Sequence, residues 1–188
     1  MPSRMPRYPA MTASLPLRYR PSLVALHWLT LLLLVAVYAC IELREFYPRG
    51  SAPRQSLKEW HYALGLVVFA TTWVRLALRA TGKAPPIVPP PPAWQAWMAR
   101  LVALLLYAML LALPMLGYVM LNADGHAVPL WGLELPRLVA ENPPLAERLE
   151  ELHETIGTAG YYLIGLHALG ALFHHYVQRD NTMQRMRL

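Results

Sequence analysis

Long apolar runs separated by short polar stretches dominate this chain of 188 residues, and four of the runs are close to 20 residues long. A helix needs about 20 apolar residues to cross the roughly 30 Å hydrocarbon core of a bilayer. Such a span has to be helical, because hydrocarbon offers no partner to an unpaired backbone N–H or C=O group. The pattern therefore predicts an all-α membrane protein, a four-helix transmembrane bundle with spans at Leu23–Ile41, His61–Arg79, Trp97–Leu121 and His153–Val177.

The polar stretches indicate how the chain is organised around these spans. Residues 1–16 are rich in Pro and Arg, which predicts a disordered arm, with Met11 as an alternative start, ahead of one transmembrane domain at 17–188. The stretch KAPPIVPPPPAW predicts a stiff polyproline spacer after the second span. The stretch ENPPLAERLEELHE predicts a helix that begins at its prolines and runs into the fourth span. Pro114 predicts a kink in the third helix.

Composition agrees with a bilayer environment, since 56% of the residues are hydrophobic and only 15% are charged. The single cysteine, Cys40, excludes an intrachain disulfide bond and any cysteine-rich zinc or iron–sulfur site. Redox chemistry in this chain would therefore need a different carrier.

Charged residues are distributed unequally between the two sides of the predicted membrane. The side with both termini and the connection after the second span carries eleven basic residues and one acid, Asp180. The opposite side carries six basic residues and ten acids. By the positive-inside rule, this distribution predicts that both termini are cytoplasmic. The net charge of +6 then reflects topology, and no nucleic-acid partner is needed to explain it.

Four histidines lie at matched depths in the predicted spans. His27 begins the first span on the cytoplasmic side, and His61 begins the second span on the outer side. His153 and His167 are separated by fourteen residues of the fourth helix, which is about 21 Å along it and about 40° around it, so they share a face. His61 then pairs with His153 in the outer layer, and His27 pairs with His167 in the inner layer. The spacing predicts two stacked bis-histidine sites.

Several kinds of site use histidines in this way. One histidine at a helix end is more often an interfacial hydrogen-bonding residue than a ligand, but four at two matched depths favour ligation. A zinc or copper transporter would favour added carboxylates or thiols near the midplane, where the sequence has none. Two imidazoles favour low-spin heme used for electron transfer. Gly65, Gly157 and Gly160 lie close to these positions and would admit a porphyrin edge or serve close helix packing.

Five stretches of the chain together carry a family signature. They are LHWLTLLLLVAVYACIELREFYPR, WVRLALR, LALPMLGYVM, WGLELP and LHETIGTAGYYLIGLHALGALFHHYVQRDNTMQRM. In these stretches the chain closely resembles the bacterial cytochrome b561 family, and most of all its superoxide-oxidising members. The resemblance runs from about Arg18 to Met186, and it implies a four-helix protein of the bacterial inner membrane with two b hemes.

The resemblance also implies an activity and site residues. His27, His61, His153 and His167 match the family's axial heme ligands. The implied reaction oxidises periplasmic superoxide and passes electrons to ubiquinone, with no catalytic residue beyond the ligands and no obligatory protein partner. His174, about 10.5 Å deeper than His167 by helix rise, matches a quinone contact. On the residues alone, His174 and its neighbour His175 could equally be interfacial anchors, and Arg75 and Arg79 are expected to hold heme propionates or lipid phosphates.

Two classes of function remain open from the sequence. A self-contained superoxide oxidase needs an outer heme that an anion can reach, and a short basic loop before His61 suits electrostatic steering of such an anion. The alternative is an electron-transfer subunit that relays electrons between a partner dehydrogenase or hydrogenase and quinone. The expected steering residues are Arg44, Arg49, Arg54 and Lys58.

Overall fold

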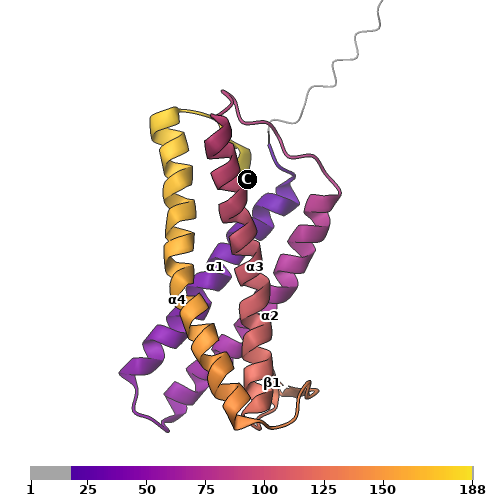
Figure 1. Ribbon diagram of the computed structural model, residues 1–188, viewed down its shortest axis with the longest axis vertical. Helices are drawn as coiled ribbons and strands as arrows, with labels where there is room; N and C mark the ends of the chain where they lie inside the picture. Colours follow the sequence, from indigo (N-terminus) through magenta and orange to yellow (C-terminus); the bar gives the residue numbers. More distant parts are fainter. Residues whose placement is uncertain (1–17, 188) are drawn as a thin grey trace, which may run out of the picture.

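The computed structural model describes residues 18–187, so the expected disordered arm and the alternative start at Met11 lie outside the described residues. Four helices, each long and apolar enough to cross a membrane, form an elongated bundle (Figure 1). The predicted fold class, an all-α four-helix transmembrane bundle, is confirmed. The helices are α1 (Pro21–Leu43), α2 (Ala52–Ala80), α3 (Ala93–Ala123) and α4 (Pro143–Phe173).

Helices α1, α2 and α3 extend beyond both ends of their predicted spans, because backbone hydrogen bonding continues into polar flanks that carry no hydropathy signal. Helix α4 begins before its predicted span but ends at Phe173, ahead of the predicted end at Val177. Proline occupies one of the first two positions of α1, α2 and α4, where its missing N–H breaks no helical hydrogen bond. Before α4, the side chain of Asn142 accepts a hydrogen bond from the N–H of Leu145 (3.2 Å). The prediction that this helix runs into the fourth span is confirmed. Pro114 lies inside α3, and the helix continues on both sides of this proline.

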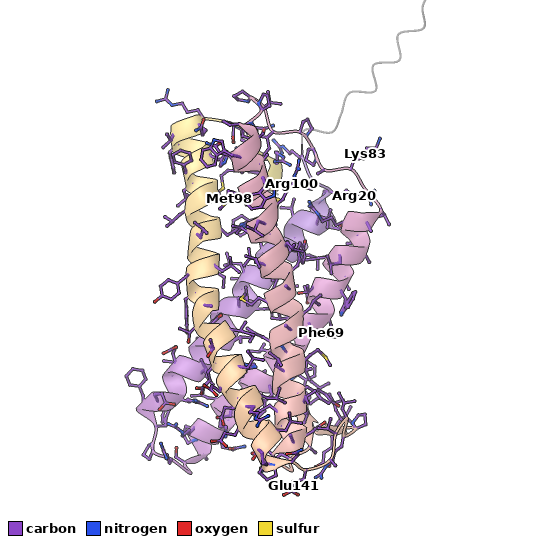
Figure 2. All side chains as sticks on the ribbon, viewed as in Figure 1. Arg20, Phe69, Lys83, Met98, Arg100 and Glu141 are labelled. Atoms are coloured by element: carbon purple, nitrogen blue, oxygen red, sulfur yellow. The ribbon has the colours of Figure 1, made fainter. Side chains whose placement is uncertain are left out.

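The two ends of the bundle are built differently, and we name them by their contents. The terminal end holds residues 18–20, the connection 81–92 and the tail 179–187, whereas the loop end holds residues 44–51 and 124–142 (Figure 1). Figure 2 shows the same division in charge, with Arg20, Lys83 and Arg100 toward the terminal end and Glu141 at the loop end.

The loop end carries a 3₁₀ turn, η1 (Arg44–Phe46), and an antiparallel hairpin of β1 (Val128–Leu130) and β2 (Leu133–Leu135). Trp131 and Gly132 turn the hairpin with positive φ angles of 48° and 87°, as a tight two-residue turn requires. The hydrophobic pattern does not predict these strands. With three residues each, they are too short to establish an alternating pattern.

Packing between the helices is pairwise, with α1 against α2 and α3 against α4, while α2 also contacts α3. The buried centre is small and consists of Val68, Met109 and Leu110 with partly buried neighbours. Large apolar side chains such as Leu32 and Leu104 are about two-thirds exposed, at 67% and 65%. An apolar outer surface of this kind is expected when lipid is the solvent.

At the terminal end, the C-terminal tail folds back onto the bundle. Helix α4 continues as a π-helical turn, η2 (His174–Gln178), which ends at Arg179 in the left-handed conformation, with a φ angle of 53°. The tail then closes with a 3₁₀ turn, η3 (Gln184–Met186), where the N–H of Tyr19 donates to the carbonyl of Arg185 (3.1 Å). These contacts fix the tail beside the start of α1.

The tail also fixes the proline-rich connection between α2 and α3. The N–H of Asn181 donates to the carbonyl of Val88 (3.1 Å), and the side-chain oxygen of Asn181 accepts from the N–H of Val88 (2.9 Å). Its side-chain nitrogen donates to the carbonyl of Pro86 (3.3 Å). The connection forms neither helix nor strand, so its position depends on the tail as well as on its own prolines.

Candidate functional site

Each end of the bundle holds one pair of histidines from different helices. At the loop end, the ring centres of His61 (α2) and His153 (α4) are 6.1 Å apart, with 67° between the ring planes. At the terminal end, the ring centres of His27 (α1) and His167 (α4) are 6.2 Å apart, with 62° between the planes. The structure thus brings together the two pairs expected from helix depth, and α4 supplies one member of each.

The spacing within each pair fits one metal ion between two imidazoles. A metal–imidazole bond of about 2.0–2.1 Å places the centres of two rings on opposite sides of one ion about 6 Å apart. Residues 18–187 contain no cluster of three or more His, Cys, Asp or Glu side chains that could hold a bare ion. Two axial imidazoles leave the equatorial positions of an iron to a porphyrin. The two pairs therefore fit heme better than a free metal.

A cavity of about 780 Å³ surrounds the loop-end pair. This volume lies within the range of about 300–1,000 Å³ that is usual for small-molecule and cofactor sites. Gly65 and Gly157 line the cavity, and no atom lies within 4 Å of the position that a Cβ would take at either of them. These two glycines leave open space beside the pair, as the sequence pattern suggested.

Two other glycines have a packing role. A Cβ at Gly160 would collide with the Tyr38 hydroxyl and the Met109 sulfur, so this glycine serves close helix contact instead of ligand space. A Cβ at Gly117 would come within 3.2 Å of Cε1 of His153, so α3 supports that ring directly. The sequence pattern did not single out Gly117, because its neighbour belongs to another helix.

Hydrogen bonding orients the loop-end histidines unequally. Nδ1 of His61 donates to the carbonyl of Val37 (3.1 Å), which fixes the ring and leaves Nε2 unprotonated and free to bind a metal. Nδ1 of His153 is buried without a hydrogen-bond partner. His153 therefore lacks a hydrogen bond comparable to the one that orients the ring of His61.

A partly buried cation, Arg75, lies beside the terminal-end pair. Its Nη2 is 3.3 Å from Nδ1 of His27, and its guanidinium lies over the Tyr107 ring at 5.6 Å from the ring centre. Its Nε is buried with no partner, and among the described residues no carboxylate forms an ion pair with it. A buried charge needs a counter-ion, so Arg75 fits a heme propionate. Arg79 is exposed and lies over the ring of Tyr19.

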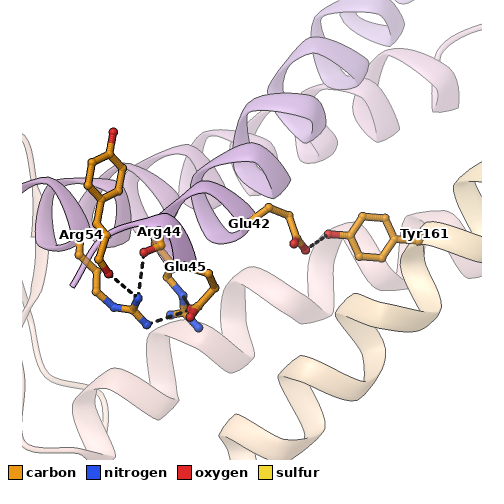
Figure 3. Close-up of polar contacts among 6 residues, drawn as sticks. Glu42, Arg44, Glu45, Arg54 and Tyr161 are labelled. Carbon is orange, nitrogen blue, oxygen red and sulfur yellow. Dashed lines mark hydrogen bonds and ion pairs between the residues drawn. The ribbon is translucent and has the colours of Figure 1, made fainter. Parts of the chain in front are cut away.

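Two of the four expected steering residues are engaged by one carboxylate (Figure 3). Nε of Arg44 and Nη2 of Arg54 are each 2.9 Å from Oε1 of Glu45. Arg54 also donates to the carbonyls of Arg44 (2.8 Å) and Tyr47 (3.1 Å), so it fixes the turn that follows α1. Part of this cluster's positive charge is thus neutralised locally.

The remaining charges around the loop-end cavity have both signs. Arg44 and Lys58 belong to its lining, together with acids such as Glu150 and Glu154. Arg49 is exposed in the loop, outside that lining. Of the four expected steering residues, Lys58 is therefore the one that lines the cavity and forms no ion pair among the described residues.

His174 has a partner that the sequence pattern did not indicate. Its Nδ1 lies 2.6 Å from Oδ2 of Asp180, and the side chains are 14% and 2% exposed. Oδ1 of Asp180 accepts from the N–H of Thr182 (2.8 Å). Burial raises the pKa of the Asp180 carboxyl, but hydrogen bonds from His174 and Thr182 lower it more, so that its pKa lies below the usual value. This carboxylate is ionised at neutral pH.

The remaining two histidines lie apart from the pairs. The ring of His175 contacts that of Tyr176, with 4.8 Å between their centres. His126 lines the loop-end cavity, and its Nδ1 is 3.2 Å from Oδ2 of Asp124. The side chains of His126 and Asp124 are both largely exposed, at 69% and 62%.

Four candidate membrane helices with two histidine pairs are the arrangement expected of a membrane cytochrome of the b type. Comparison with known families agrees, since the family model for prokaryotic cytochrome b561 matches residues 18–187. The chain belongs to the prokaryotic cytochrome b561 family, and membership implies heme b and electron transport in the membrane.

Curated relatives cover nearly the whole chain. Cytochrome b561 homolog 1 of Escherichia coli (strain K12) is 40% identical over 169 residues, which are 90% of this chain and 96% of the relative. A protein of Yersinia pestis named probable superoxide oxidase CybB is 36% identical over 163 residues, covering 87% and 92%. Cytochrome b561 homolog 2 of Escherichia coli (strain K12) is 25% identical over 172 residues, covering 91% and 92%.

Proposed function

We propose that this chain is a diheme cytochrome that oxidises superoxide to dioxygen and passes the electrons to ubiquinone. Each histidine pair would hold one heme b, with His61 and His153 as axial ligands at the loop end and His27 and His167 at the terminal end. The family assignment and the relative named a probable superoxide oxidase support the proposal. The protein would act on its own, without an obligatory protein partner.

The observation that carries this proposal is the loop-end cavity. It reaches both His61 and His153, and Arg44 and Lys58 form part of its lining. A small anion such as superoxide can approach a heme held there, and the cationic side chains favour its approach. At the opposite end, His174 would donate a hydrogen bond to a quinone carbonyl.

The proposed reaction consumes two superoxide anions for each ubiquinone. Two superoxide anions each lose one electron and leave as dioxygen, and no bond is broken. One ubiquinone takes up those two electrons and two protons to form ubiquinol. The two histidine pairs would hold the hemes, which would serve as one-electron carriers between the two ends of the bundle. The protein positions the carriers, admits the anion at one end and supplies protons at the other.

The direct test is reduction of the purified holoprotein by superoxide. We expect an enzymatic superoxide source to reduce the hemes, superoxide dismutase to prevent this, and added ubiquinone to reoxidise them. Absorbance of the reduced b heme measures each step. If superoxide leaves the hemes oxidised while a chemical reductant reduces them, the proposal is wrong and the relay subunit of a dehydrogenase or hydrogenase becomes the better assignment.

The proposed orientation places the terminal end in the cytoplasm and the loop end in the periplasm. In a Cys40→Ser background, an impermeant maleimide should label Arg49→Cys in intact cells, whereas Lys83→Cys should react only after lysis. Both positions are exposed, so access to the reagent decides the result. The reverse labelling pattern would contradict the orientation and, with it, the periplasmic source of superoxide.

A further inference from the structure

The contact between His174 and Asp180 is the closest approach of a carboxylate to a histidine among the described residues. It joins the first residue of the π-helical turn η2 to the start of the tail, and the N–H of Asp180 also donates to the carbonyl of His174 (3.2 Å). The carboxylate side chain is 2% exposed. One side-chain and one backbone hydrogen bond thus hold this buried acid beside His174.

The geometry determines which ring nitrogen is available. A carboxylate can only accept, so Nδ1 of His174 donates to Asp180, and Nε2 has no hydrogen-bond partner among the described residues. A proton added to Nε2 makes the ring a cation, and the Asp180 carboxylate is then its counter-ion at hydrogen-bond distance. The pair as a whole is then neutral, which lowers the cost of keeping a charged ring at the membrane surface.

Quinone reduction needs such a proton source. A quinone carbonyl gains electron density as it is reduced, and each of its two oxygens must finally bind one proton. A donor that only hydrogen-bonds the oxygen stabilises the bound quinone, whereas a donor that gives up its proton also drives the reduction forward. A neutral imidazole with a proton on Nε2 can do the first but is a very weak acid for the second.

We propose that His174 and Asp180 form a proton-donating dyad for quinone, with His174 as the catalytic acid and Asp180 as the residue that positions it. The inference rests on the proposed function. During each one-electron transfer to the quinone, the N–H bond at Nε2 of His174 breaks and an O–H bond forms on a quinone oxygen. The ring becomes neutral, its Nδ1 proton stays on the Asp180 side, and a solvent proton restores Nε2. Two such events with two electrons from the b hemes yield one quinol.

If Asp180 only held the turn in place, Asp180→Asn would leave the rate of quinone reduction unchanged. Its Oδ1 accepts from the N–H of Thr182, as in many turns, and an asparagine accepts that hydrogen bond equally well. Asp180→Asn therefore keeps the turn. Its amide nitrogen, however, donates to Nδ1 of His174, which moves the single proton of the neutral ring to Nε2. The variant retains a hydrogen-bond donor for quinone but loses the acid.

The test compares Asp180→Asn with His174→Ala in the holoprotein, with reoxidation of the hemes by ubiquinone as the assay. We expect Asp180→Asn to lower kcat at least tenfold with KM changed less than twofold, and Asp180→Glu to restore part of the rate. His174→Ala should raise KM three- to tenfold in addition to lowering kcat. Asn181→Ala, which weakens the tail contact to Val88 without touching the dyad, is the matched control and should leave kcat unchanged.

A second readout does not depend on activity. In ¹⁵N-histidine NMR spectra, the resonance lost in His174→Ala identifies His174, and we expect Nδ1 of this ring to carry a proton in the wild type and to carry none in Asp180→Asn. A normal kcat in Asp180→Asn, or an unchanged tautomer, would overturn the dyad, while slow reoxidation in His174→Ala would still support the quinone contact. If neither variant is slower, both the dyad and the proposed quinone contact at His174 are wrong.

Discussion

At the scale of single residues, each histidine pair has a distinct environment that should control one heme. His61 is oriented by the carbonyl of Val37, whereas the ring of His153 rests against Gly117. His27 has the guanidinium of Arg75 beside it. Ligation decides whether heme is retained, and the neighbouring charge decides how readily it accepts an electron.

Loss of one ligand should remove one heme and leave the other. His153→Ala should reduce bound heme from two per chain to one, because a single imidazole cannot hold a low-spin heme with two axial bonds. His126→Ala is the matched control, since this exposed histidine lines the same cavity but belongs to neither pair. Heme per chain from pyridine hemochrome spectra is the measurement. Two hemes in His153→Ala, or one in the wild type, would contradict the assignment.

Removing the charge of Arg75 should lower the reduction potential of the terminal-end heme. A nearby cation disfavours the more positive ferric iron, and one charge about 8–10 Å away contributes on the order of 1–2 kcal/mol at an effective dielectric constant of 20. Arg75→Gln is therefore expected to shift one of two potentials downward in a redox titration. Arg79→Gln, at an exposed position on the same helix, should change both potentials much less. Equal shifts in the two variants would argue against a specific role for Arg75.

At the scale of elements, α4 organises both ends of the molecule. It supplies one histidine to each pair, and its continuation into η2 places His174 at the terminal end. The close contact at Gly160 keeps α4 near α1 and α3, while Gly157, one turn earlier, borders the cavity. Gly160 is thus tightly packed against other helices, whereas Gly157, three residues earlier, faces open space.

Substitutions along α4 should separate packing from ligand space. Gly160→Val should lower thermal stability by about 1–3 kcal/mol, because its side chain would collide with Tyr38 and Met109. Gly170→Ala should be neutral or stabilising by about 0.5–1 kcal/mol, since no atom lies within 4 Å of its Cβ position and alanine favours a helix. Thermal unfolding in detergent measures both. Equal stability of the two variants would show that α4 can shift away from its neighbours.

At the scale of the whole molecule, charge is arranged along the bundle axis. The terminal end is basic, and Figure 2 shows Arg20, Lys83 and Arg100 toward it. The loop end combines acids with a few cations, of which Arg44 and Lys58 border the cavity. Glu45 pairs with Arg44 and also with Arg54, which lies outside the cavity lining, so the field at the cavity is weaker than the number of basic residues suggests. Steering of superoxide should therefore depend mainly on Lys58.

Lys58→Gln should slow heme reduction by superoxide about two- to fivefold at low salt, since one nearby charge contributes up to about 1 kcal/mol in water. The wild-type rate should fall as salt rises, because the Debye length shrinks to about 10 Å at 0.1 M. Arg49→Gln removes the same charge from the same loop but outside the cavity lining, and should have a smaller effect. Stopped-flow absorbance at several salt concentrations measures these rates. A wild-type rate that does not respond to salt would exclude electrostatic steering.

The sequence by itself determined the number of spans, the fold class and the depth of the histidines. These are local properties: a run of about 20 apolar residues is set by its own composition, and the rise of 1.5 Å per residue converts spacing into depth once the membrane aligns the helices. The predicted juxtaposition of His61 with His153 and of His27 with His167 followed from that arithmetic. Heme ligation by these pairs stays a prediction.

Only the tertiary structure decided which groups surround those histidines. The ion pair of Glu45 with Arg54, the collision at Gly160 and the position of Arg75 beside His27 depend on side chains that belong to different turns or helices. The bond from His174 to Asp180 depends on a π-helical turn and a left-handed residue that reverse the chain. Periodicity cannot reveal such contacts, because each is set by how the elements and the tail pack together, and not by the hydrophobicity of either partner.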